Sequence, residues 1–377
     1  YVLKSFENIC EYVSPKFYKY VKGVYDAVND NHILSEKPLD LDGNLIRDLP
    51  RNYYLHLTYK CNLNCIYCYN KQIRTNFEEL PFNKWEVILS KILPYAHNIV
   101  LTGGEPFLSP KLSNIIDRIK ETKKSVKVEI ISNCMTNFET YPNIDSIMNK
   151  IDGIIFSCDS LSDIKQPRIN FNPTLFRHNI AFLRNKYKTL KITISSVYSK
   201  NNYCELKTIK EFSHSHSIDF RQVLIVPNNR NDINLLPPLS EYICTFPSEQ
   251  KALKGPRFYC GAGAGVLSID PMGNVYPCQS LHFKDYKLGN IIEESLTDIS
   301  RGKRAKILMT KFNVRNISTC KDCNVKFICG AGCRAATLKT EGDASVFPKT
   351  LCEYYKASAT HNLRMTPSLN DLSLIEW

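Results

Sequence analysis

The sequence has no apolar run long enough to cross a membrane. A transmembrane helix needs about 18 consecutive apolar residues, and no such stretch occurs among the 377 residues of the chain. No secretory leader pattern is present either. Because the sequence begins with Tyr1 rather than Met, we expect the natural chain to start further upstream. These absences favour a cytoplasmic protein without a membrane partner.

Long blocks of lysine or arginine are also absent, although the formal net charge is +12. A basic balance favours an acidic partner such as a nucleic acid, an acidic peptide or an anionic lipid. Lysine is spread along the whole chain, however, and a solvated basic surface explains the charge equally well. The lack of a basic block argues against nucleic acid as the partner. The length predicts about two globular domains.

Cysteine, by contrast, is abundant, with 15 residues. In a chain of this size without a leader, cysteines at short fixed spacings predict metal or cluster ligands rather than a disulfide framework. Ten of the cysteines fall into such groups. The other five are scattered, and we expect most of them to be inert buried thiols: Cys10, Cys134, Cys158, Cys204 and Cys244.

The first half of the chain alternates β-rich runs with amphipathic stretches. The predicted strands are Tyr53–Thr58, Asn98–Leu101, Val126–Ser132, Gly153–Ser157, Leu190–Val197 and Phe220–Val226. The predicted helices between them are Asn83–Tyr95, Pro110–Thr122, Asn143–Lys150, Thr174–Lys186 and Tyr203–Ser213. Six βα units in series predict an α/β fold with a parallel sheet, curled into a full or partial barrel. Its chemistry is expected at the carboxyl ends of the strands.

The remaining chain divides into shorter parts. Residues 1–50 are expected to be partly helical, over Glu7–Asn29, and to be the tail of a missing recognition domain. The barrel is predicted over 51–227, a linker over 228–241, a cysteine-rich domain over 242–365 and a tail over 366–377. Within the cysteine-rich domain, Val266–Ile269 and Val275–Pro277 predict a hairpin. Such a domain needs bound clusters because its apolar core is small.

The first cysteine set is Cys61, Cys65 and Cys68, directly after the first predicted strand. Three thiolates can hold a four-iron cluster and leave one iron without a protein ligand, which is the open corner that catalysis requires. A zinc site completed by His56 is the alternative. The spacing favours a cluster but leaves both assignments open.

A second segment, Thr102-Gly103-Gly104-Glu105-Pro106, ends the next predicted strand. Its glycines allow close backbone approach to a ligand, and Glu105 offers a carboxylate to an ammonium group. Alone, it is equally well a strand-ending turn. Together, the cysteine set and this segment resemble the radical S-adenosylmethionine (SAM) superfamily, over roughly residues 51–227.

The resemblance implies a 4Fe–4S cluster on the first set and SAM bound at its open iron. One electron from a low-potential donor such as flavodoxin or ferredoxin then yields a 5′-deoxyadenosyl radical, which abstracts hydrogen from the substrate. The SAM contacts that it implies are Gly103, Gly104 and Glu105 near the amino group, Tyr67 near the adenine, and Ser132 and Asn133 near the ribose. Further polar contacts are expected from Ser157, Ser195 and Ser196.

Downstream lie seven cysteines, and Gly273 stands between the first two of them: Cys260, Cys278, Cys320, Cys323, Cys329, Cys333 and Cys352. A zinc ribbon would use four of these cysteines and leave three without a role. The spacing is similar to the SPASM extension of radical SAM enzymes, which implies two auxiliary 4Fe–4S clusters. The resemblance assigns Cys320, Cys323, Cys329 and Cys352 to one of them, the distal set. It assigns Cys260, Cys278 and Cys333 to the other, the nearer set.

Two positions depart from the sulfatase-maturing members of this group. Lys254 stands where those enzymes have a further cysteine, and Gln279 stands where they have a catalytic aspartate. The nearer cluster therefore either keeps an open iron, which could bind a substrate thiolate, or is completed by Cys244. Gln279 cannot act as a base, which argues against sulfatase maturation.

We therefore expect a radical SAM maturase that cross-links a ribosomally made precursor peptide bearing a leader, most plausibly through a thioether. Carbon–carbon and carbon–oxygen cross-links remain open. One alternative is a SPASM oxidoreductase that acts on a small molecule or decarboxylates a peptide terminus. Another is a non-catalytic iron–sulfur or zinc protein that binds a regulator or nucleic acid, which the basic charge supports. A non-catalytic protein of this kind would not explain the Gly103-Gly104-Glu105-Pro106 segment.

Overall fold

The computed structural model describes Lys22 and residues 49–74, 78–163, 166–245, 257–343 and 346–364. Except for Lys22, the helical segment predicted over Glu7–Asn29 lies outside the described residues. The same is true of Cys10, Lys254 and the tail 366–377.

A curved nine-stranded sheet organises the described residues, with the order β11-β10-β9-β1-β3-β4-β5-β7-β8. Six of its strands run parallel in chain order: β1 (Asn52–His56), β3 (Asn98–Thr102), β4 (Lys127–Ser132), β5 (Gly153–Ser157), β7 (Ile192–Tyr198) and β8 (Asp219–Leu224). Each lies within two residues of its predicted bounds at either end. The predicted partial (β/α)6 barrel is therefore confirmed.

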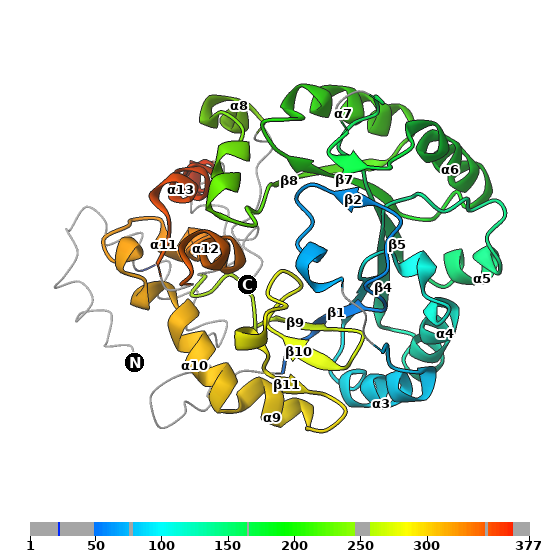
Figure 1. Cartoon of the computed structure of the whole chain (residues 1–377), viewed down its shortest axis with the longest axis horizontal. Coiled ribbons are helices and arrows are strands. Elements are labelled where there is room, and N and C mark those ends of the chain that lie inside the picture. Colours follow the sequence, from blue (N-terminus) through cyan, green and yellow to red (C-terminus); the bar gives the residue numbers. More distant parts are fainter. Residues whose placement is uncertain are drawn as a thin grey trace.

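Helices cover the outer side of this sheet (Figure 1). They are α3 (Phe82–Ile92), α4 (Leu112–Thr122), α5 (Ile144–Met148), α6 (Pro173–Lys186) and α7 (Leu206–Ser215). Alternate strand residues such as Ile154, Phe156 and Ile194 are fully buried against the helices. Because side chains alternate along a strand, Ser157 and Ser195 lie on the opposite, inner side of the sheet.

The hairpin of the cysteine-rich domain extends the barrel sheet. Strand β9 (Val266–Ile269) pairs in parallel with β1, and β10 (Asn274–Tyr276) returns antiparallel to β9. The short β11 (Gly289–Asn290) then pairs with β10. The predicted hairpin is confirmed. Because it lies beside β1, the start of the cysteine-rich domain is next to the strand that leads into the loop of the first cysteine set.

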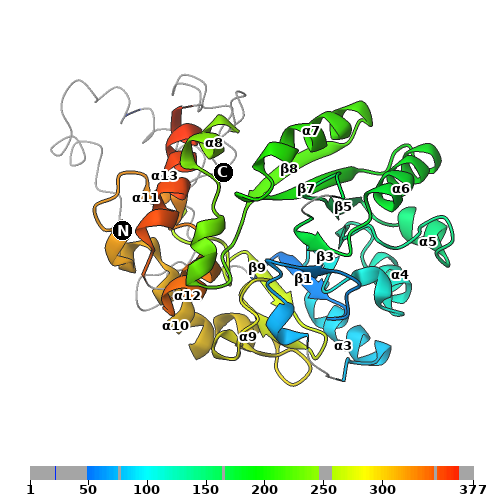
Figure 2. The same cartoon turned by 45° about the horizontal axis from the view of Figure 1, so that its top comes forward.

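The rest of the cysteine-rich domain is built from helices that gather beside the barrel (Figure 2). They are α9 (Leu296–Arg301), α10 (Lys303–Phe312), α11 (Lys326–Cys329), α12 (Arg334–Glu341) and α13 (Lys349–Arg364). A second, smaller core packs Val314, Ile317, Phe347 and Leu351 together. Among the described residues, no helix has the length and apolar composition needed to span a bilayer.

The segment expected to be a linker is a packed part of this second core. It contains the 3₁₀ helix η5 (Arg230–Leu235) and the start of α8 (Leu239–Cys244). Leu236 is buried, and Ile233 and Leu235 pack beside it in the same cluster. The other 3₁₀ helices are η2 (Lys71–Ile73), η3 (Pro106–Leu108), η4 (Tyr203–Glu205), η6 (Lys284–Tyr286), η7 (Val314–Asn316) and η8 (Ser318–Cys320).

Candidate active site

The first cysteine set occupies the loop that leaves β1 inside the curve of the sheet (Figure 1). A small ladder fixes this loop, because β2 (Asn64–Cys65) pairs antiparallel with β6 (Arg168–Ile169). All three cysteines are free thiols, with Cys65 buried and Cys61 and Cys68 partly exposed. Burial raises the pKa of Cys61 and of Cys65, and the charge of Cys68 adds to both shifts. The three thiols therefore lie near enough to influence one another, and their role as cluster ligands stays a prediction.

Gly103 and Gly104 are packed against the backbone of the cysteine loop itself. A Cβ on Gly104 would lie 2.1 Å from the carbonyl oxygen of Lys60, and one on Gly103 would lie 2.2 Å from that of Thr58. Gly103 also has φ +138°, a conformation that favours glycine. The Gly104 amide donates to Thr58 O at 2.7 Å, and the Glu105 amide donates to Lys60 O at 2.8 Å. The glycines thus fasten the end of β3 to the loop that carries the thiols.

Glu105 is fully buried at the junction of β3 and β4. Its carboxylate accepts hydrogen bonds from Ser132 Oγ at 2.9 Å, from the Asn133 amide at 2.7 Å and from the Phe107 amide at 3.2 Å. Burial raises the pKa of Glu105 to about 7, against the lowering effect of these donors. The carboxylate therefore holds the ends of two strands together, and its contact with a SAM ammonium group stays a prediction.

Asn133 continues this network towards the cysteine loop. Its Nδ2 donates to Asn62 Oδ1 at 2.7 Å and lies 3.7 Å from Cys61 Sγ. Ser132, in contrast, is buried, and its Oγ accepts from the Cys134 amide at 3.0 Å. Of the two expected ribose contacts, Asn133 is the one whose side chain reaches the cysteine loop.

Ser157 and Ser195 lie opposite one another in the register of β5 and β7, and Ser195 lies opposite Arg221 of β8. Arg221 Nε donates to Ser195 Oγ at 3.1 Å. These side chains therefore form a polar row on the inner side of the sheet. Ser196 faces the other way, because its buried hydroxyl donates to the carbonyl oxygen of Cys158.

Two arginines that the sequence analysis did not single out reach the first set. Arg168 lies opposite Cys65 in the β2–β6 ladder, with Nη1 at 3.8 Å from Cys65 Sγ, and it covers the Tyr67 ring at 5.5 Å. Its Nε also pairs with the buried carboxylate of Asp159 at 2.9 Å. Arg74 Nη2 donates to Cys68 Sγ at 3.0 Å. No local spacing in the sequence links Arg168 to Cys65.

The downstream cysteines influence one another's pKa values within the nearer and the distal set, and their role as cluster ligands stays a prediction. Burial raises the pKa of Cys278, and the charges of Cys333 and Cys260 raise it further. Burial likewise raises the pKa of Cys329 to about 11, and among the neighbouring charges Cys320 and Cys352 add to it. Cys323 completes the distal set, because its charge raises the pKa of both Cys320 and Cys352. The nearer and distal sets are thus separate groups of thiols.

The scattered cysteines differ in exposure. Cys134 and Cys158 are fully buried, as predicted for inert thiols, whereas Cys204 and Cys244 are exposed. Cys244 ends α8 and lies near Tyr198, whose pKa its charge helps to raise after burial. Among the described residues, the charges that raise the pKa values of Cys278 and Cys333 include that of Cys260 but not that of Cys244.

The zinc alternative was expected to use His56 as a fourth ligand. His56 is fully buried, with its ring 4.3 Å from that of His282, and burial lowers its pKa to about 3. Among the described residues, no three His, Cys, Asp or Glu side chains are arranged to hold a single metal ion, and this finding covers the thiol sets as well as His56.

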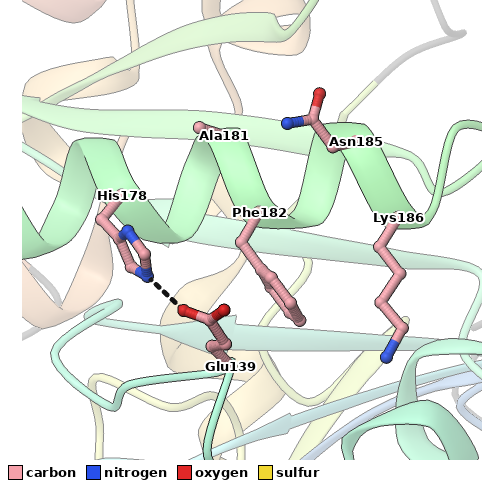
Figure 3. A pocket seen from close by; sticks show the side chains of 6 residues that line it. All are labelled: Glu139, His178, Ala181, Phe182, Asn185 and Lys186. Carbon is pink, nitrogen blue, oxygen red and sulfur yellow. Dashed lines mark hydrogen bonds and ion pairs between the residues drawn. The ribbon is translucent and has the colours of Figure 1, made fainter.

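A surface hollow of about 480 Å³ lies away from these thiols, against the outer face of α6 (Figure 3). His178 and Glu139 pair across it at 3.1 Å, and both side chains are about half exposed. Its lining contains no cysteine. The hollow therefore has no part in the candidate site.

Comparison with known protein families decides the assignment. The model of the Radical SAM superfamily matches residues 55–212, and the SPASM iron–sulfur cluster-binding domain matches residues 260–324. This chain is a radical SAM enzyme with a SPASM domain. The two domains imply that the enzyme uses iron–sulfur clusters and SAM.

Relatives of the enzyme share low sequence identity over most of its length. It is 24% identical to the sporulation killing factor maturation protein SkfB of Bacillus subtilis, over 75% of this chain and 72% of the relative. It is also 24% identical to the subtilosin biosynthesis protein AlbA of the same species, over 67% of this chain and 59% of the relative. The fold is similar to that of Streptococcus suis SuiB bound to SAM, with a TM-score of 0.64 at 19% identity over 90% of this chain and 83% of SuiB.

Proposed function

We propose that this enzyme matures a ribosomally made precursor peptide by abstracting hydrogen from it and closing a cross-link. The observation that carries the proposal is the presence of the first, nearer and distal thiol sets in one chain whose relatives are named for peptide maturation. SuiB, whose fold is similar, has also been solved with its precursor peptide SuiA. We propose the same class of partner here, together with a low-potential electron donor such as flavodoxin or ferredoxin.

In this proposal, Cys61, Cys65 and Cys68 hold a cluster with one open iron. When bound, the cluster and SAM supply the 5′-deoxyadenosyl radical. The chain's own part is to position the reactants. Gly104 and Glu105 brace the thiol loop against β3 and β4. The polar row of Ser157, Ser195 and Arg221 faces the inner side of the sheet, where it can orient SAM or peptide.

The thioether form of the cross-link rests on the nearer set. Cys260, Cys278 and Cys333 supply three thiolates, so a four-iron cluster held by them keeps an open iron. Cys244, the other candidate ligand, lies near Tyr198, and its charge is not among those that shift the pKa of Cys278 or Cys333. A substrate thiolate bound there would be placed to couple with the carbon radical, with its proton released to solvent and the surplus electron passed to the cluster. We therefore propose sulfur-to-carbon bond formation rather than a carbon–carbon link.

The domain boundaries follow the same proposal. We assign the radical SAM barrel to residues 51–227 and the SPASM domain to residues 242–365. The segment between them belongs structurally to the core of the SPASM domain, because Leu236 packs there.

The test is an anaerobic reaction of the reconstituted enzyme with SAM, a reductant and a short cysteine-bearing peptide encoded beside its gene. Mass spectrometry should show the loss of two hydrogens, and iodoacetamide should no longer alkylate the peptide cysteine. A peptide that loses two hydrogens but still accepts iodoacetamide would contradict the thioether. A peptide of unchanged mass, with active SAM cleavage, would contradict the peptide substrate. The matched control is Cys61→Ala.

A further inference from the structure

Two guanidinium groups contact the first cysteine set from outside the cysteine motif. Arg74 follows η2, and its Nη2 donates to Cys68 Sγ at 3.0 Å. Its Nη1 donates to the carbonyl oxygen of Leu63 at 2.8 Å, so the group spans the loop. Arg168 approaches from β6, with Nη1 at 3.8 Å from Cys65 Sγ. Arginine stays charged at any pH the protein tolerates, so both groups place fixed positive charge beside the thiolates.

The two arginines differ in how their charge is balanced. Arg168 pairs with Asp159, whose side chain is fully buried and which also accepts from the Val197 amide at 2.7 Å. Asp159 therefore offsets part of the effect that the Arg168 charge has on Cys65. Among the described residues, no carboxylate forms an ion pair with Arg74. Arg74 thus brings to Cys68 a guanidinium group without such a partner there.

A third cation approaches Cys68 from the SPASM domain. Lys339 of α12 lines a cavity of about 160 Å³ together with Cys68 and Tyr69. Its Nζ donates to Asn228 Oδ1 at 2.9 Å. Burial lowers the pKa of Lys339, while the charges of Cys333, Cys278 and Cys68 raise it. Lys339 therefore lies under the influence of both the first and the nearer set. Asp232, which lines the same cavity, partly offsets its charge.

We propose that Arg74 is a positioning residue that raises the reduction potential of the cluster held by Cys61, Cys65 and Cys68, with a smaller contribution from Lys339. Reduction adds one negative charge to the cluster, and an adjacent cation with an N–H···S hydrogen bond stabilises that charge. The inference rests on the proposed cluster assignment. It connects the SPASM domain to the radical-forming step through Lys339.

The test is a redox titration of the full-length reconstituted enzyme, monitored by electron paramagnetic resonance without any peptide. The signal to follow is the component that changes when SAM is added and that disappears in Cys61→Ala. Arg74→Gln should shift its midpoint to a more negative potential, with Arg74→Lys between that variant and the wild type. Lys339→Met should give a smaller shift in the same direction. Arg118→Gln, on the outer helix α4 and partly exposed, should leave the midpoint unchanged.

An unchanged midpoint in Arg74→Gln at full iron content would overturn the proposal. If Arg74→Gln fails to assemble the cluster, the neutral variant Arg74→Met takes its place, and a wild-type midpoint in that variant would overturn the proposal. These results are separable from the proposed function, since the titration uses no peptide. A wild-type enzyme without a SAM-sensitive signal would instead refute the cluster assignment itself.

Discussion

The barrel and the SPASM domain differ in what holds their backbones in place. The barrel has a continuous ladder of parallel strands and a large core shared with α3 to α7. In the SPASM domain, α9 and α10 still pack on this large core, whereas the part around α11, α12 and α13 has a smaller core of its own. The barrel can therefore fold on apolar burial, whereas this last part of the SPASM domain depends on its thiols binding clusters. Replacing the cluster-binding cysteines should thus affect the folding of the two regions differently.

The largest effect should come from the first set. Replacing Cys61, Cys65 and Cys68 together with alanine should abolish reductive SAM cleavage, because no open iron remains to bind SAM. The barrel should stay folded, since its core does not include a cluster. Chromatographic detection of 5′-deoxyadenosine measures the loss, and far-UV circular dichroism checks the fold. Cleavage retained by this variant would rule out the catalytic assignment.

Cys320→Ala should damage the SPASM domain more than the barrel. The distal set would lose one of its four thiols, so we expect the loss of about four irons and lower solubility. Limited proteolysis should then cut first within residues 257–364, while fragments of the barrel persist. Cys204→Ala is the matched control, because Cys204 is exposed and belongs to none of the sets. Equal proteolysis of both regions would contradict the claim that the SPASM domain depends on its clusters more than the barrel does.

Gly104→Ala should disturb the contact between the barrel and its thiol loop. The added Cβ would lie 2.1 Å from the carbonyl oxygen of Lys60, so the loop or the end of β3 has to move. Overpacking of this kind costs about 1–3 kcal/mol. Chemical denaturation should show that loss, and iron bound at the first set should fall. Gly265→Ala is the matched control, because Gly265 likewise has no positive φ and an added Cβ there meets no atom within 4 Å.

Glu105 should give the barrel a pH dependence of its own. Burial raises the pKa of this carboxyl from 4.5 to about 7, so the folded state holds its proton more tightly than the unfolded state. The resulting stabilisation is full below pH 4.5 and is lost as the pH rises towards 7, in total about 3 kcal/mol.

The measurement is the unfolding free energy of the cluster-free protein from pH 4.5 to pH 7, the interval set by these pKa values. Glu105→Gln cannot ionise and should remove most of that fall. A wild type and variant with parallel pH profiles would show that Glu105 does not titrate in this range.

The sequence predicts the barrel well because local patterns define each strand and helix. Gly153–Ser157, for example, has the predicted bounds. The pairing of β9 with β1 was not predictable, since it joins residues more than 200 positions apart in the chain. The packing of the expected linker was not predictable either, since its partners Phe347 and Leu351 come from the far end of the chain.

The first cysteine set could be found from the spacing of its motif, whereas the nearer and distal sets came from the resemblance to the SPASM extension. The side chains around these sets could not be predicted. Gly103 and Gly104 were expected to let a ligand approach, yet their closest neighbours are the backbone atoms of Thr58 and Lys60. Arg168 contacts Cys65 because the two residues pair in the β2–β6 ladder, which no local sequence pattern predicts.

The central claim is that the first, nearer and distal sets each hold a four-iron cluster. Quantifying iron, sulfide and zinc in the anaerobically reconstituted enzyme tests it most directly. The account predicts about twelve irons and twelve sulfides per chain and no zinc, with about four irons lost in the variant lacking Cys61, Cys65 and Cys68. Stoichiometric zinc, or an iron content that this variant leaves unchanged, would contradict it.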